Sequence, residues 1–225
     1  METISRRIRS YVCRGGNTTK GQRQAFLQYA DKWIIPYNPR QLLDFTQVFS
    51  RSAPVTLEIG FGSGDATAQI AQDNPHHDYL GVEVYPSGVG RLLMRIEEKN
   101  IGNIRIIQHD AVEVLQHMIG HGSLDAVHVF FPDPWPKKRH HKRRLLQPNL
   151  LRQLAEKLKP GGYFYFVSDW EEYAWQVLET CRREPLLENA YQGYAPAQSW
   201  RPKTRFQRKG EEAAREIFEI YFHRI

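Results

Sequence analysis

Short apolar runs alternate with amphipathic stretches along the chain from about residue 54 onward. Each apolar run has the length of a buried strand, and the runs cover residues 55–60, 79–84, 104–108, 124–131 and 163–167. The stretches between and after them have helical spacing, near residues 64–73, 87–100, 111–118, 148–158 and 170–182. Strands separated by helices of this length are joined by right-handed crossovers. The pattern therefore predicts an α/β fold whose mostly parallel sheet is covered by helices on both faces.

The alternation changes at both ends of the chain. Residues 186–192 and 217–222 predict two further strands with a basic loop and a short helix between them, so we expect an antiparallel pair to finish the sheet. The sequence Lys159-Pro160-Gly161-Gly162 should end one helix and turn the chain into the next strand. The first 50 residues predict a helix over 21–31 within an amino-terminal arm or cap. Residues 51–225 then form one α/β domain.

The composition is that of an ordinary globular protein of one domain, with 41% hydrophobic and 25% charged residues in a chain of 225. No uncharged apolar run approaches the roughly 18 residues that span a bilayer, and no secretory signal is recognisable. The two cysteines, Cys13 and Cys181, form no disulfide framework and no zinc-ligand spacing. We therefore expect a cytoplasmic protein without a structural metal or membrane contact, either a monomer or a homodimer.

Positive charge is concentrated in three places, although the net charge of +6 is modest. The three runs comprise Arg6, Arg7, Arg9, Arg14, Lys20 and Arg23, then Lys137–Arg144, then Arg201–Lys209. Any one of them alone would be consistent with a solvated surface. Three such runs in a chain that is otherwise acidic or neutral favour a polyanionic partner.

Glycine and acidic residues mark a candidate ligand site at the strand ends. Gly60, Gly62 and Gly64 join the first core strand to its helix, where they allow a sharp turn and a close backbone approach to a ligand. By itself this could be only a tight connection. Three acidic residues also lie at or near the ends of the first three predicted core strands, namely Glu58, Glu83 and Asp110.

The acidic character of this predicted pocket indicates the kind of ligand that it binds. Three carboxylates repel phosphates but suit a ligand that carries a sulfonium and an ammonium group, and S-adenosyl-L-methionine fits this description. Glu83 is placed to accept hydrogen bonds from ribose hydroxyls, and Asp110 from an exocyclic amine such as that of adenine. A dinucleotide fits less well, because its fingerprint requires glycine where this chain has Asp65.

A rigid acidic loop closes the fourth predicted strand. Asp133 stands between Pro132 and Pro134, which restrict the backbone and can hold the carboxylate in one orientation. Trp135 offers a face on which a nucleic-acid base could stack. Alternatively, the loop is purely structural and its acid caps the helix predicted near residue 148. The dense basic run from Lys137 onward should grip phosphates beside this loop.

These motifs resemble the bacterial tRNA (guanine-N7)-methyltransferase family over nearly the whole chain. The matching segments are Ile8–Val12, Thr19–Gln22, Val55–Gly64, Gly81–Val84, His109–Leu115 and Phe130–Arg144. The last is the most specific, because a Pro-Asp-Pro-Trp sequence followed by a basic run is not general among methyltransferases. The resemblance implies a Rossmann-like class I methyltransferase fold, with a mostly parallel seven-stranded sheet and an antiparallel terminal strand.

The resemblance also implies roles for individual residues. Cofactor contacts would be made by Glu58, Glu83, Asp110 and Asp133, with Asp133 in the catalytic region. Contacts to tRNA would be made by Lys137, Asp169, Thr204, Arg205, Phe206 and Gln207, and the target would be the guanine at position 46 of the variable loop. Gln207 departs from the family, which normally has Glu there, so its contact would be weakened or rearranged. Asp169 could instead be a helix N-cap.

Asp133 has a specific chemical role if the target is N7 of guanine. That nitrogen has a free lone pair, so no general base is needed, and its methylation creates a cationic purine. A carboxylate that accepts hydrogen bonds from guanine N1–H and the exocyclic amine would stabilise the developing charge. Three alternatives remain open: methylation of an exocyclic amine, a non-catalytic RNA-binding protein, and a small-molecule methyltransferase.

Overall fold

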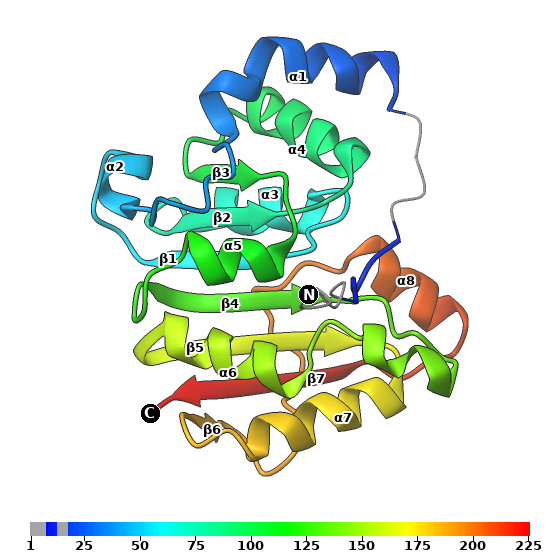
Figure 1. Cartoon of the computed structure of the whole chain (residues 1–225). Coiled ribbons are helices and arrows are strands. Elements are labelled where there is room, and N and C mark those ends of the chain that lie inside the picture. Colours follow the sequence, from blue (N-terminus) through cyan, green and yellow to red (C-terminus); the bar gives the residue numbers. More distant parts are fainter. Residues whose placement is uncertain (1–7, 13–17) are drawn as a thin grey trace, which may run out of the picture.

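The computed structural model describes residues 8–12 and 18–225 (Figure 1). Within them, one seven-stranded sheet has the order β3-β2-β1-β4-β5-β7-β6. Its strands are β1 (Val55–Ile59), β2 (Asp78–Val82), β3 (Ile104–Ile107), β4 (Leu124–Phe130), β5 (Leu158–Ser168), β6 (Leu187–Asn189) and β7 (Phe218–Arg224). The first five strands pair in parallel, whereas β7 is antiparallel to both β5 and β6. The predicted fold class and the antiparallel pair at the end of the sheet are thus confirmed.

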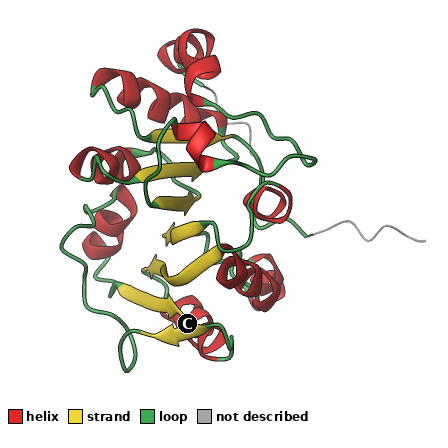
Figure 2. Ribbon diagram, turned by 90° about the vertical axis from the view of Figure 1, so that its left-hand side faces the viewer, coloured by secondary structure: helices red, strands yellow, loops and turns green. Residues whose placement is uncertain are grey.

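Helices cover both faces of the sheet (Figure 2). They are α1 (Lys20–Trp33), α2 (Phe45–Phe49), α3 (Asp65–Asp73), α4 (Pro86–Glu98), α5 (Ala111–His117), α6 (Pro148–Lys157), α7 (Glu171–Arg182) and α8 (Arg205–Glu212). A 3-10 helix, η1, covers Lys138–Arg143. The sequence pattern did not predict α2 or η1. The five residues of α2 are too few to show a repeating helical pattern, and the basic run of η1 has no apolar face.

The central strands are mostly apolar because helices cover both of their sides, and the buried Glu58 of β1 and His128 of β4 are exceptions. Leu57, Val127 and Phe164, from β1, β4 and β5, are fully buried. Such strands read as continuous apolar runs rather than as alternating ones. This explains why the sequence pattern predicts β1 and β4 to within a residue.

The helix end predicted at Lys159–Gly162 is confirmed, since α6 ends at Lys157, but the turn predicted there is wrong, because β5 already begins at Leu158. Leu158 pairs with Leu124 and Tyr163 pairs with Ala126, so four residues of β5 face one residue of β4. The strand therefore bulges at this point. Gly161 adopts φ +81°, a conformation that glycine tolerates at little cost.

The amino-terminal residues pack against the rest of the chain. Thr19 caps α1 through a reciprocal capping box with Gln22, and the helix lies along α4, where Gly90 allows close approach to Gln22. Ile34 then forms a parallel bridge with Ile106 of β3. A boundary between a cap (1–50) and a methyltransferase domain (51–225) stays a prediction. Part of the first predicted basic run, namely Arg6, Arg7 and Arg14, lies outside the described residues, as does Cys13.

No helix in the described ranges is long and apolar enough to cross a membrane. In the same ranges, no group of three or more His, Cys, Asp or Glu side chains is arranged to hold a metal ion.

Candidate active site

A cavity of about 560 Å³ opens where the carboxyl ends of β1, β2, β3 and β4 meet. In the described part of the chain, nine predicted site residues line it, namely Glu58, Gly60, Gly62, Glu83, Asp110, Asp133, Thr204, Arg205 and Phe206. Gly64, Lys137, Asp169 and Gln207 are not among the lining residues. The structure therefore brings together the strand-end acids, the glycine turn, the Asp133 loop and the start of α8, which are far apart in sequence.

The glycine turn has a backbone that only glycine adopts readily. Gly60, Gly62 and Gly64 have φ values of +72°, +59° and +69°. Gly64 also lies against α4, since a Cβ there would be 2.7 Å from the Leu92 Cβ. Across the turn, a Cβ on Gly88 would lie 2.1 Å from the Gly62 carbonyl oxygen. Gly64 is thus explained by helix packing, whereas Gly60 and Gly62 face the cavity.

Glu58 is a buried carboxyl group in the wall of the cavity. Its side chain belongs to β1, and the residue is only 3% exposed. Burial raises the pKa of Glu58 to about 7, and the nearby Glu83 carboxylate contributes to the rise. The ionised form of Glu58 is therefore poorly stabilised by the protein alone.

Glu83 links the glycine turn to the loop that follows β2. Its carboxylate accepts backbone hydrogen bonds from Gly62 (2.9 Å), Val84 (2.7 Å) and Tyr85 (3.0 Å). Burial raises the pKa of Glu83, and the backbone donors lower it while the Asp133 charge raises it further. The residue both shapes the turn and presents negative charge to the cavity.

Asp110 and Asp133 face the cavity from the ends of β3 and β4. Asp110 is buried and caps α5, since its side chain accepts a hydrogen bond from the Val112 backbone at 3.0 Å. Asp133 is exposed at the rim, yet the surrounding protein raises its pKa by desolvation. The helix that follows the loop begins at Pro148 without a side-chain cap, so the alternative capping role for Asp133 is wrong.

The loop around Asp133 is strained and tightly held. Phe131 and Trp135 on either side of it have positive φ values of +51° and +46°, which bulky residues rarely adopt. Arg144 holds the loop in place, because its buried guanidinium donates hydrogen bonds to the Pro134 carbonyl at 2.9 Å and to the Gln176 side chain at 2.6 Å. Arg144 is therefore a structural cation, which corrects its predicted place among the phosphate-gripping residues.

Trp135 contacts the amino-terminal segment rather than lining the cavity. Its indole donates to the Ser10 carbonyl at 3.0 Å, and the Arg143 guanidinium lies 4.9 Å from the ring centroid. His140 contacts the ring edge to face. The predicted stacking face is thus already in contact with protein groups. Phe206, which is 55% exposed, is the aromatic residue from α8 that lines the cavity.

The other predicted tRNA contacts occupy different surroundings. Lys137 is exposed and leads into η1, beside the Asp133 loop. Asp169 forms an ion pair with Arg215 at 2.6 Å and does not cap α7, whose N-cap is Trp170, so the N-cap alternative is wrong. Thr204 caps α8 through a 3.0 Å hydrogen bond from the Gln207 backbone.

Sequence reasoning missed several residues of the site. Those that line the cavity without having been predicted include Ser10, Tyr11, Ser87, Arg91, His109 and Lys209. Sequence reasoning also missed the buried ion pair between Arg201 and Glu219, which contacts α8 through Gln207. One signal could have indicated this pair: Glu219 is an acidic residue inside the apolar final strand, where an unpaired charge would be very costly.

Comparisons with known proteins match the chain to methyltransferases. The family described as "Putative methyltransferase" matches residues 52–220. A tRNA (guanine-N(7)-)-methyltransferase from Acidovorax sp. (strain JS42) is 53% identical over 217 residues, covering 96% of this chain and 86% of the relative. One from Chromobacterium violaceum (strain ATCC 12472) is 52% identical, covering 98% and 97%.

Solved structures share the fold at low sequence identity. The 16S rRNA methyltransferase KamB aligns with a TM-score of 0.57 at 14% identity, covering 82% of this chain and 95% of that one. A SAM dependent methyltransferase from Aquifex aeolicus aligns with a TM-score of 0.54 at 11% identity, covering 80% and 88%. These structures identify a Rossmann-like methyltransferase fold. With relatives more than half identical over almost its whole length, the chain belongs to the tRNA (guanine-N7)-methyltransferase family.

Proposed function

We propose that this protein acts in the cytoplasm, where it transfers a methyl group from S-adenosyl-L-methionine to N7 of a guanine in the variable loop of tRNA. One observation carries the proposal. The Asp133 loop, which is specific to the family it resembles, lines the same cavity as the glycine turn and the acidic strand ends. The names of its close relatives support the target atom and the RNA class.

The residues of the cavity fit the proposed methyl donor. Burial raises the pKa values of Glu58 and Glu83, so a ligand with positive charge would stabilise their ionised forms. The open backbone at Gly60, where a Cβ would meet nothing within 4 Å, leaves room for a ligand against the turn. Asp110 would hold the adenine amine. When bound, the donor supplies an electrophilic methyl group attached to a sulfonium.

Asp133 would act on the target base by electrostatic stabilisation. Guanine N7 offers a lone pair, so the protein need not remove a proton before transfer. The Asp133 carboxylate would accept hydrogen bonds from N1–H and the exocyclic amine, and these strengthen as the purine becomes cationic. The flanking prolines restrict the backbone here, and the hydrogen bond from Arg144 to the Pro134 carbonyl holds the loop. Phe206 would offer its exposed ring to the base.

Exposed cations near the cavity would hold the RNA backbone. Arg91, Arg205 and Lys209 line the cavity itself, and η1 adds a run of basic side chains directly after the Asp133 loop. Contacts to phosphates of this kind make affinity depend steeply on salt. A small-molecule methyltransferase would have no use for these groups.

The test is to incubate the protein with a labelled methyl donor and unmodified tRNA, then to identify the modified nucleoside and its position by mass spectrometry. We expect 7-methylguanosine in the variable loop. A methyl group on N2 or N6, or no transfer, would overturn the proposal. Asp133→Asn should slow single-turnover transfer on the order of 100-fold or more. Asp31→Asn, at an exposed site on α1, is the matched control and should leave the rate unchanged.

A further inference from the structure

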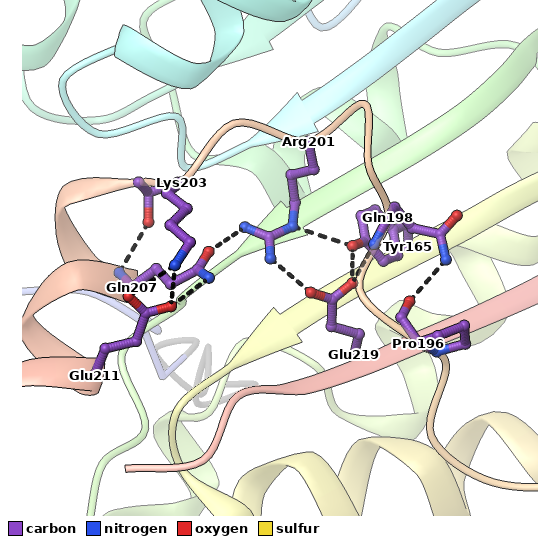
Figure 3. Close-up of polar contacts among 9 residues, drawn as sticks. Tyr165, Pro196, Gln198, Arg201, Lys203, Gln207, Glu211 and Glu219 are labelled. Carbon is purple, nitrogen blue, oxygen red and sulfur yellow. Dashed lines mark hydrogen bonds and ion pairs between the residues drawn. The ribbon is translucent and has the colours of Figure 1, made fainter. Parts of the chain in front are cut away.

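A buried guanidinium connects the start of α8 to the sheet. Arg201, whose side chain is 2% exposed, donates in three directions (Figure 3). Nε donates to the Tyr165 hydroxyl at 3.1 Å, Nη1 to Gln207 Oε1 at 2.7 Å and Nη2 to Glu219 Oε1 at 2.6 Å. Tyr165 and Glu219 belong to the paired strands β5 and β7, so their positions are fixed by the sheet. A buried ion pair with these additional hydrogen bonds has a single favoured geometry.

Gln207 extends this connection into α8. Its carbonyl oxygen accepts from Arg201, and its amide nitrogen donates to Glu211 Oε1 at 2.9 Å, one turn further along the helix. The residue is 7% exposed, and both ends of its amide are used within the protein (Figure 3). Lys203 also donates to Glu211, at 3.0 Å. The hydrogen bond from Gln207 and the neighbouring Lys203 both lower the pKa of Glu211, so Glu211 is an ionised acceptor.

With Glu at position 211, the side chain at position 207 must both accept and donate a hydrogen bond. Arg201 only donates, whereas the ionised Glu211 only accepts. A carboxylate at 207 would still accept from Arg201 but would bring a second negative oxygen against Glu211, at about the spacing of the present hydrogen bond. Lys203, an exposed cation, would offset this only in part.

We propose that Gln207 is a positioning residue that joins the buried Arg201–Glu219 pair to Glu211, and so fixes α8 over the reaction cavity. It does not contact tRNA through its side chain. The N-cap residue Thr204 and the first-turn residues Arg205 and Phe206 line the cavity. A shift of this turn would displace Phe206 from its place near Gly62. The inference rests on the proposed function only in so far as these residues receive the target base.

The experiment compares four proteins: wild type, Gln207→Glu, Glu211→Gln and the double variant. Gln207→Glu should lower kcat for tRNA on the order of tenfold, because a small displacement of a positioned group is costly in rate, and should change the Kd for tRNA little. Hydrogen exchange of the amides of residues 205–212 should become faster without tRNA. Glu211→Gln should resemble wild type, because the Gln oxygen still accepts from Gln207.

The double variant provides the decisive comparison. It reverses the polarity of the pair, so that Gln at 211 donates to Glu at 207, and it should restore both the slow exchange and the rate. If Gln207 contacts tRNA instead, Gln207→Glu will raise the Kd without changing exchange in the free protein, and the double variant will not recover. That result would overturn the inference. Failure of the proposed function would appear separately, as absence of transfer by wild type, while the exchange measurement would still test the positioning role.

Discussion

Replacing Glu58 with Gln should stabilise the protein at alkaline pH, even though it removes a residue of the site. The carboxyl group is buried, and its pKa is raised from 4.5 to about 7 in the folded protein. Between these two values the folded protein holds the proton, while the unfolded chain has lost it. Raising the pH across this window therefore favours unfolding of the wild type, and Gln at this position removes that contribution.

The size of the effect follows from the shift. Each unit of pKa difference corresponds to about 1.4 kcal/mol, so moving from about pH 5 to about pH 8.5 should change the stability difference by about 2–3 kcal/mol in favour of Glu58→Gln. Urea unfolding of both proteins at the two pH values measures this difference, since the other ionisable groups are shared. Affinity for S-adenosyl-L-methionine should fall in the same variant. A stability difference that does not change with pH would refute the reasoning.

Three further changes test other parts of the site. Gly88→Ala places a methyl group against a backbone carbonyl of the glycine turn and should lower the free energy of unfolding by about 1–3 kcal/mol, measured by thermal unfolding. The control Gly120→Ala, where the nearest atoms are 3.8 Å away, should cost far less, and equal effects would contradict this reasoning. Trp135→Phe removes a hydrogen bond worth about 1 kcal/mol and should speed proteolysis within residues 8–12, and unchanged cleavage would argue against that contact. Lys137→Ala should reduce the log–log salt slope of tRNA binding by roughly 1, and an unchanged slope would remove Lys137 from the phosphate contacts.

The sheet and the cavity were predictable because each depends on local pattern. Buried parallel strands are mostly apolar, and parallel strands place their carboxyl ends at one edge of the sheet. Glu83 and Asp110 could therefore be assigned to one site from sequence alone. The Asp133 loop was recognisable because two prolines around an acid are uncommon. The short α2 and the bulge at Lys159–Gly162 were not predictable, because their positions depend on tertiary packing.

Contacts between distant charged residues could not be predicted from spacing. Arg144 and Arg201 both belong to basic runs, yet both are buried. Arg144 holds the Asp133 loop, and Arg201 connects α8 to the sheet. A run of cations does not reveal which members meet a carboxylate or a carbonyl in the fold. The same limit affected Gln207, whose side chain faces Arg201 and Glu211 rather than the cavity. Its partners lie on the loop before α8 and one turn along the helix, and the connection to the sheet through Glu219 is visible only in three dimensions.

The arrangement of acids around one cavity is tested most directly by a crystal structure of the protein with S-adenosyl-L-methionine. We expect the adenosine beside Glu83 and Asp110, the methionine part along the glycine turn near Glu58, and the transferable methyl group directed toward the space next to Asp133. A donor bound elsewhere on the surface, or one whose methyl group points away from Asp133, would contradict the account.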